Sequence, residues 1–311
     1  MIRSVLWESL KSNVNAVKTP PVNETWTIQR LLNWMTEYFT RKGIDSPRLS
    51  AELLLCRVLE LERIQLYTLF DRVVQKPQLD ALHALVKRAA GHEPVAYLVG
   101  RCEFYSLSLA ITPDCLIPRP ETELLVEQAI DFLRRRSGPQ AVLDVCTGSG
   151  CIAAAIAKNV PDATVAAADI CEAALSVAAK NIETHGLTER VRLLCGDLFD
   201  PVIKGLDAPA FDLIVSNPPY VSQAEYDKLD KNVKDYEPKH ALLAGADGLD
   251  VYRRMTAQVG DFLKPDGALM LEIGYLQGKA VRALLEQTDL FSDIRIEKDL
   301  AGCERIAVAR R

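Results

Sequence analysis

The chain has 311 residues, enough for two domains, and its 49% hydrophobic and 25% charged residues are typical of a globular protein. Its formal net charge of −5 argues against a protein that mainly binds phosphate backbones, so no direct nucleic-acid binding is expected. No apolar run approaches the ~20 residues that cross a membrane, and the first residues lack the pattern of a signal peptide. We therefore expect a cytoplasmic protein without membrane contact.

The eight cysteines and four histidines show no spacing typical of metal ligands, and no Cys-x-x-Cys pair occurs. We expect free thiols in a reducing compartment, with no metal site and no disulfide. The chemistry must therefore come from other side chains.

The first third of the chain has helical periodicity. Residues 1–23 show no strong period and are interpreted as an N-terminal extension. Apolar spacing then predicts four helices over residues 24–98. The first starts near Glu24, and the second starts at Pro47 after a cap at Ser46. The third spans Arg63–Phe70, and the fourth spans Gln78–Ala90. This helical domain carries no acidic pair, metal set or nucleophile, so both a structural cap and a docking surface for a macromolecule remain open as its role.

A linker and a proline-rich segment follow. Two short alternating runs, Arg101–Ser106 and Ser108–Ile111, predict a β-hairpin within a linker over residues 99–116. In Ile117-Pro118-Arg119-Pro120-Glu121-Thr122-Glu123, the prolines set the entry to a helix and the acidic residues suit its N-terminus. Arg119, held between two prolines, is not explained by a helix start alone.

Residues 117–311 alternate between strands and helices, which predicts an α/β domain with a doubly wound, mostly parallel sheet. A turn is expected at Lys264–Gly267. The expected strands are residues 141–145, 164–168, 191–195, 211–215, 268–273, 294–298 and 305–309, the last two forming a closing pair. The expected helices are residues 151–159, 173–185, 251–263 and 277–288.

A glycine-rich turn, Cys146-Thr147-Gly148-Ser149-Gly150, joins the first of these strands to a helix. Such a turn with a downstream acid occurs in dinucleotide enzymes and in S-adenosylmethionine (SAM) enzymes. Two details favour SAM. Asp144 lies where it can help to hold the methionine amino end, and the G-x-G-x-x-G pyrophosphate fingerprint is absent.

The ends of the next two strands supply the other expected ligand contacts. Asp169 is the acid expected to take both hydroxyls of a ribose with its two oxygens. Asp197 and Leu198 are expected to meet the adenine amine and the face of its ring, respectively.

Asn217-Pro218-Pro219-Tyr220 follows an apolar strand and ends it abruptly, because neither proline has an N–H to pair. The side-chain carbonyl of Asn217 and the backbone carbonyl of Pro218 can accept the two hydrogens of a planar NH₂ group, while the Tyr220 ring covers its flat face. Two acceptors draw electron density to a poorly nucleophilic nitrogen and fix its direction of attack. The motif therefore predicts alkylation of a planar nitrogen.

Together, these motifs resemble the HemK/PrmC family of class I SAM-dependent methyltransferases, which modify the N5 amide of glutamine in peptide chain release factors. The resemblance spans residues 25–311 and extends to four further stretches: Gly91-His92-Glu93-Pro94-Val95-Ala96-Tyr97-Leu98, Glu237-Pro238 with Ala241-Leu242, Asp247-Gly248-Leu249-Asp250 and Leu271-Glu272-Ile273-Gly274. Cys146 departs from the glycine usual in the wider family, and we expect the turn to survive with a slightly altered backbone.

The resemblance implies methylation of the glutamine in the Gly-Gly-Gln motif of release factors, with SAM as methyl donor and S-adenosylhomocysteine as product. It implies a seven-stranded methyltransferase domain over residues 117–311 and a helical domain that helps to dock the factor. Arg119 and Glu121 are then expected to bind the protein substrate, and Asn217 to lie between substrate and cofactor.

Other functions were weighed against this one. A DNA adenine N6-methyltransferase uses the same four-residue motif, but it would want a basic target-recognition region, which the acidic composition disfavours. A glutamine methyltransferase of a ribosomal protein is a close alternative, disfavoured by the stretch that includes Arg119 and Glu121. A binding module without activity is disfavoured by the intact Asn217, and a dehydrogenase by the missing third glycine.

Overall fold

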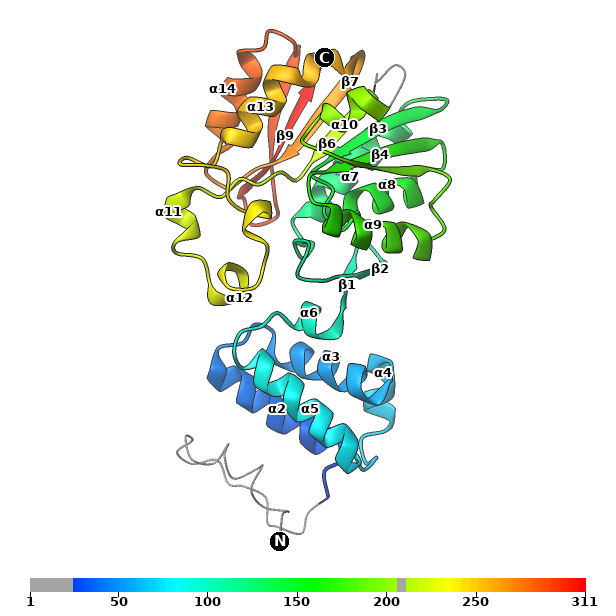
Figure 1. The fold of residues 1–311 in the computed structure, drawn as a ribbon, viewed down its shortest axis with the longest axis vertical. Coiled ribbons are helices and arrows are strands. Elements are labelled where there is room, and N and C mark those ends of the chain that lie inside the picture. The colour runs from blue at the N-terminus through cyan, green and yellow to red at the C-terminus, as the bar shows by residue number, and fades with distance from the viewer. Residues whose placement is uncertain (1–24, 206–210) are drawn as a thin grey trace. The chain divides into compact units, whose positions relative to one another are not determined.

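A computed structural model describes residues 25–205 and 211–311 (Figure 1). The expected extension over residues 1–23 lies outside the described residues. The chain divides into two compact units, Met1–Lys87 and Arg88–Arg311, which are described separately. In the described parts of the chain, no helix is both long enough and apolar enough to pass through a bilayer.

The first unit is a helical bundle, as expected. Thr27 caps its first helix by accepting the Arg30 N–H, and Gly43, with a φ of 68°, ends it. Its helices are α2 (Ile28–Lys42), α3 (Pro47–Leu59), α4 (Arg63–Thr68) and α5 (Lys76–Ala89), the last of which crosses the boundary between the units. Ser46 occupies the N-cap position before Pro47, as expected, but its backbone is left-handed and its side chain makes no capping hydrogen bond.

A buried carboxylate joins α3 to α4. Glu52 is only 1% exposed and accepts hydrogen bonds from Arg48, Arg63 and the hydroxyl of Tyr67. Burial alone would raise the pKa of Glu52, but these donors lower it overall, so the carboxylate stays ionised. The cluster is explained by packing, because a buried charge needs such partners.

The second unit contains the hairpin and the predicted seven-stranded sheet. A short helix that sequence reasoning missed, α6 (Val95–Val99), precedes the hairpin strands β1 (Arg101–Phe104) and β2 (Leu107–Ala110). The sheet has the order β5-β4-β3-β6-β7-β9-β8, in which β9 is antiparallel to both neighbours and the other pairings are parallel. Its strands are β3 (Gln140–Val145), β4 (Ala163–Asp169), β5 (Val191–Cys195), β6 (Phe211–Ser216), β7 (Leu263–Glu272), β8 (Asp293–Lys298) and β9 (Glu304–Arg310).

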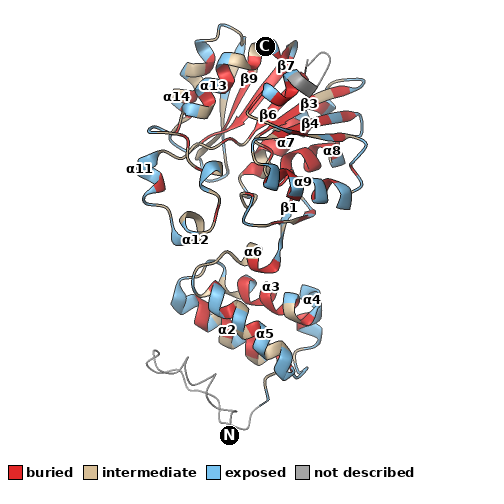
Figure 2. Ribbon diagram, viewed as in Figure 1, coloured by how far each residue is buried: buried red, intermediate tan, exposed pale blue. Residues whose placement is uncertain are grey.

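Helices cover both faces of this sheet because alternate strand residues point to opposite sides. Val142, Leu213 and Met270 pack with one set of helices, whereas Leu143, Ile214 and Leu271 pack with the other. The first set is α7 (Thr122–Arg134), α8 (Cys151–Asn159) and α9 (Glu172–Thr184), and the second is α10 (Asp200–Gly205), α13 (Asp250–Gln258) and α14 (Gly278–Glu286). The strands between these layers are largely buried (Figure 2).

The segment before β7 differs from expectation. Helix α13 ends at Gln258, a 3₁₀ turn covers Val259–Asp261, and the strand already starts at Leu263. The pairing jumps from Phe211 with Leu263 to Leu213 with Ala268, so the expected turn at Lys264–Gly267 forms a bulge within the strand. The remaining short elements, α11 (Gln223–Tyr226), α12 (Lys231–Lys234) and a 3₁₀ turn at Lys239–Ala241, lie between β6 and α13 and were not predicted.

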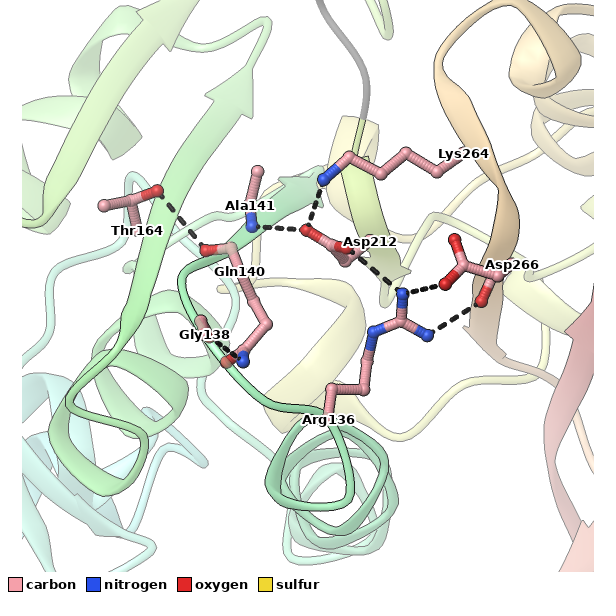
Figure 3. Close-up of polar contacts among 8 residues, drawn as sticks. All are labelled: Arg136, Gly138, Gln140, Ala141, Thr164, Asp212, Lys264 and Asp266. Atoms are coloured by element: carbon pink, nitrogen blue, oxygen red, sulfur yellow. Dashed lines mark hydrogen bonds and ion pairs between the residues drawn. The ribbon is translucent and has the colours of Figure 1, made fainter.

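Charged side chains fasten the amino ends of three strands (Figure 3). Buried Asp212 of β6 accepts the Ala141 N–H of β3 at 2.8 Å and pairs with Lys264 at 2.8 Å and Arg136 at 3.3 Å. Arg136 also pairs with the exposed Asp266. Burial alone would raise the pKa of Asp212, but Lys264, the Ala141 N–H and Arg136 lower it overall.

We predict that Asp212→Asn lowers the free energy of unfolding at pH 7 by about 1–3 kcal/mol, because two cations lose their buried partner. A carboxylate with a lowered pKa stabilises the fold above its unfolded-state pKa, and that contribution disappears as pH falls through the folded-state value. The difference between wild type and variant in urea unfolding should therefore shrink below about pH 4. Asp266→Asn, which removes an exposed partner of the same arginine, should cost less, and an equal loss from both variants would contradict the role given to Asp212.

Candidate functional site

A pocket opens at the carboxyl ends of β3, β4, β5 and β6, which is where ligands bind in open α/β sheets. It contains about 810 Å³ of empty space, counting open solvent at its mouth. Every residue that lines it belongs to the unit Arg88–Arg311. The strand ends contribute Cys146 to Ser149, Asp169, Ile170, Gly196 to Leu198, Asn217 and Pro219, and other segments contribute Asp114 to Leu116, Pro118, Thr122, His240 and Ala241.

The glycine-rich turn has the backbone that its sequence demands. Gly148 and Gly150 have φ angles of 56° and 77°, in the left-handed region that favours glycine. A Cβ on Gly150 would lie 3.1 Å from the Cβ of Ala178 on α9, so this glycine also allows two helices to pack closely. A Cβ on Gly148 would meet nothing within 4 Å, so it would project into open space at the pocket.

Cys146 adopts the conformation that a glycine would favour at its position. Its φ is 61°, which costs an L residue roughly 1–2 kcal/mol. The expected turn is thus present, with the strain placed at the residue that departs from the family pattern. Burial raises the pKa values of the Cys146 and Cys151 thiols, so both stay protonated and neither is a nucleophile.

Asp144 lies near the carboxyl end of β3, just before the glycine-rich turn. It is fully buried, is not among the residues that line the pocket, and accepts the Thr147 hydroxyl at 2.5 Å and the Ala153 N–H at 3.1 Å. Burial raises its pKa to about 7, partly opposed by these two donors. Asp144 thereby fastens the turn to α8 through Oδ2, and the expectation that it helps to hold a ligand's amino end stays a prediction.

Asp169 lines the pocket and is oriented by two backbone groups. Its Oδ2 accepts the Gly148 N–H at 2.8 Å, and its Oδ1 accepts the Cys171 N–H at 2.9 Å. An ionised carboxylate has about four acceptor sites, so two remain for a ligand. The carboxylate therefore couples the end of β4 to the glycine-rich turn and still presents two acceptors to the pocket.

The end of β5 contributes Asp197 and Leu198, and both line the pocket as expected. Leu198 has a left-handed backbone, with a φ of 45°, and its side chain is buried. Asp197 Oδ2 pairs with Arg254 of α13 at 2.5 Å, a partner that the sequence did not indicate. The ion pair leaves the second carboxylate oxygen of Asp197 for other donors.

The end of β6 holds Asn217 by a chain of hydrogen bonds. Asn217 Nδ2 donates to the Thr122 hydroxyl at 3.2 Å, and that hydroxyl donates to Oε2 of Glu272 at 2.6 Å. Asn217 lines the pocket, and its hydrogen bond to Thr122 uses the amide nitrogen and not the side-chain carbonyl. Thr122 and Glu272 were not predicted as site residues, although both belong to stretches that carry the family resemblance.

The remaining residues of this motif are also fixed in place. Pro219 lines the pocket, whereas Pro218 is buried and neither Pro218 nor Tyr220 forms part of its wall. The Tyr220 hydroxyl faces Oε1 of Glu272 at 3.4 Å, and its backbone carbonyl accepts Gln277 Nε2 at 2.9 Å. Burial raises the pKa of Tyr220, so its hydroxyl remains a donor.

Arg119 and Glu121 do not lie in the pocket wall. Arg119 pairs with buried Glu237 at 2.6 Å, and Glu121 lies 3.8 Å from Arg305. Both charges have partners within the protein, and the expectation that these two residues meet the substrate stays a prediction. Their neighbours Pro118 and Thr122 line the pocket instead.

Sequence comparison relates both parts of the chain to known proteins. Residues 30–100 match the PrmC N-terminal domain, and residues 121–234 match the methyltransferase small domain. The release factor glutamine methyltransferase of Rhodopirellula baltica is 45% identical over 289 residues, which are 91% of this chain and 96% of the relative. That of Geobacter sulfurreducens is 42% identical over 287 residues, which are 92% of this chain and 98% of the relative.

A solved structure also matches, that of a release factor-specific protein-(glutamine-N5) methyltransferase from Alicyclobacillus acidocaldarius. It is 33% identical and covers 65% of this chain and 99% of its own, with a TM-score of 0.41. The two relatives above already match nearly the whole chain at more than 40% identity. The chain therefore belongs to the family of release factor glutamine methyltransferases.

Proposed function

We propose that this protein transfers a methyl group from SAM to the N5 amide nitrogen of the glutamine in the Gly-Gly-Gln motif of peptide chain release factors. The observation that carries the proposal is the hydrogen bond from Asn217 Nδ2 to Thr122, which leaves the Asn217 carbonyl as an acceptor in the pocket. An acceptor beside a glycine-rich turn is the arrangement that methylation of a planar NH₂ group requires.

The residues present fit SAM. The open space beside Gly148 lets a ligand approach the backbone of the turn closely. Asp169 would hold the ribose hydroxyls with its two remaining acceptor sites, Asp197 the adenine amine, and Leu198 the face of the ring. When bound, SAM supplies a methyl group activated by its sulfonium charge, and the carboxylates of Asp114, Asp169 and Asp197 in the pocket wall favour a cation.

The protein's own contribution is mainly orientation. The Asn217 side-chain carbonyl and the Pro218 backbone carbonyl would accept the two hydrogens of the substrate amide and aim its nitrogen at the methyl group. The Tyr220 ring would cover the flat face of the amide. No general base is needed, because the N-methylated amide cation is a strong acid and loses its proton readily.

The helical domain, which we assign to residues 24–98, would serve recognition of the release factor more than chemistry, with residues 99–116 as the linker and 117–311 as the methyltransferase domain. This division differs from the boundary between the compact units, which lies after Lys87. Its support is the position of the pocket, since all the lining residues come from the second unit. The alternative substrate, a ribosomal protein, is tested by offering both substrates with SAM and measuring intact masses, and methylation of the ribosomal protein alone would overturn the proposal.

We predict that Asp169→Ala weakens SAM binding by about 1–3 kcal/mol, the cost of losing charge-assisted hydrogen bonds. Isothermal titration calorimetry with SAM measures this directly. Asp299→Ala is a matched control, because Asp299 also accepts two backbone N–H groups, those of Ala301 and Cys303, but lies outside the pocket wall. Unchanged affinity in Asp169→Ala, or equal losses in both variants, would remove Asp169 from the ribose site.

We predict that Asn217→Ala lowers kcat by roughly two orders of magnitude or more, as loss of one preorganised polar contact does. SAM affinity should change less, because the turn and Asp169 are untouched. Asn217→Asp should also lose rate, since a carboxylate there pays a desolvation cost and alters the field at the sulfonium. Single-turnover methyl transfer to a release factor checks both variants, and a near wild-type rate in Asn217→Ala would show that the residue only ends the strand.

A further inference from the structure

A buried carboxylate lies behind the proposed acceptor. Glu272 ends β7, the strand next to β6, and is only 2% exposed. It contacts the site through two hydroxyls: Thr122 at 2.6 Å on Oε2 and Tyr220 at 3.4 Å on Oε1. It does not line the pocket, so it would not touch a substrate there.

The hydrogen bonds among these groups have only one consistent direction when Glu272 is ionised. A carboxylate only accepts, so the Thr122 hydroxyl must donate its single proton to Glu272. Thr122 then has only lone pairs to offer Asn217, which must use its NH₂ group to meet them. The Asn217 carbonyl is thereby turned to the pocket.

We propose that Glu272 is a positioning residue that acts through Thr122 to fix the orientation of the Asn217 amide. The inference rests on the proposed function, because it explains how one of the two acceptors for the substrate amide is kept in place. The oxygen and nitrogen of an Asn side chain are similar in size, so packing alone does not choose between the two orientations. Hydrogen-bond polarity chooses, and the carboxylate sets that polarity.

Loss of the carboxylate would leave both orientations of the Asn217 amide possible. A neutral group at position 272 could donate to Thr122, whose hydroxyl could then donate to the Asn217 carbonyl. The flipped amide would present its NH₂ to the NH₂ of the substrate glutamine, so that two donors would face each other. Such a site would still bind SAM but would no longer hold the substrate nitrogen in line for attack.

The surroundings of Glu272 allow it to lose its charge near neutral pH. The pKa of Glu272 is raised to about 7 overall, mainly by burial. The hydroxyls of Thr122 and Tyr220 and the charge of Arg305 oppose this rise, whereas the charge of Glu121 adds to it. Arg305 is itself paired with Asp299 at 2.9 Å, and the Tyr252 hydroxyl donates to the backbone carbonyl of Glu272 rather than to its carboxylate. The carboxylate form therefore prevails above about pH 7 and is lost as pH falls below it.

The test is single-turnover methyl transfer from SAM to a purified release factor by the full-length protein. Glu272→Gln and Thr122→Val should each lower the rate on the order of 10- to 100-fold, while the dissociation constant for SAM stays close to wild type. Thr122→Val should also lower the unfolding midpoint, because it takes a donor from the buried carboxylate. Thr122→Ser keeps the hydroxyl and should restore most of the rate. Thr256→Val is a matched control, because it removes another buried threonine hydroxyl, which donates to the Tyr252 carbonyl, and should leave the rate unchanged.

Two further measurements separate positioning from general packing. In an Asn217→Ala background, Glu272→Gln should have little additional effect on the rate, because the residue that it orients is gone. The wild-type rate should fall as pH drops below about 7, and this fall should be absent in Glu272→Gln. Buried Asp144 also titrates near pH 7 but is present in both proteins, so the difference between their profiles reports on position 272.

The outcomes distinguish the two proposals. If the wild-type protein binds SAM but does not methylate a release factor, the proposed function fails. If the wild-type protein is active and Glu272→Gln matches it in rate and pH profile, Glu272 does not position Asn217. Additive effects of Glu272→Gln and Asn217→Ala would also overturn the inference, because they would show that Glu272 acts elsewhere.

Discussion

The parallel register of three strands is the constraint on which the site depends. Val145, the last residue of β3, pairs with Ala168 on one side and Ser216 on the other, so the ends of the three strands lie within one residue of the same level. Side chains and backbone then lock these ends together: Ser216 Oγ donates to the Val145 carbonyl at 2.6 Å, and the Thr147 N–H donates to the Ala168 carbonyl at 3.0 Å. A slip of one residue would move each loop along the sheet edge and separate the groups that share the pocket.

The glycine-rich turn shows how this edge accommodates both strain and polar groups. Cys146 and Leu198 have left-handed backbones, and both line the pocket. Residues in such conformations persist only where the surroundings hold them, and here Asp144 fastens the turn from beneath while Asp169 holds it from the side. The two carboxylates thus preorganise the backbone before any ligand arrives, which reduces the conformational cost of binding.

Much of the fold could be predicted because it depends on local patterns. Period-two and buried apolar runs located the strands, and the two prolines after Ser216 located the end of β6. The bulge at Lys264–Gly267 could not be predicted, because it is set by how β6 pairs with β7 rather than by the turn residues themselves. The missing side-chain hydrogen bond of Ser46 has a similar cause, since its left-handed backbone depends on how the chain enters α3.

The candidate site was predictable to the extent that its residues follow strand ends. Asp169, Leu198 and Asn217 all line the pocket, because the carboxyl ends of parallel strands meet at one edge. The internal partners of Arg119 and Asp144 could not be predicted, and their expected roles toward a ligand stay predictions. Pairs such as Arg119 with Glu237 join residues far apart in sequence, and one sequence carries no signal of them.

Two buried acids, which lie at opposite ends of the sheet's strands, show how the partners of a carboxylate determine its role. Asp212, at the amino ends, lies against Lys264 and Arg136, and its pKa is lowered, so its charge is permanent at neutral pH and serves stability. Glu272, at the carboxyl ends, is held by hydroxyls, and Arg305, the cation that lowers its pKa, is already paired with Asp299. Hydroxyls satisfy the lone pairs of a carboxylate without neutralising its charge. The effect of burial is therefore larger than that of the hydrogen bonds, and the pKa of Glu272 rises. A charge that is weakly held is a poor structural clamp, but it imposes a direction on the hydrogen bonds around it, and at this edge of the sheet those hydrogen bonds lead to Asn217.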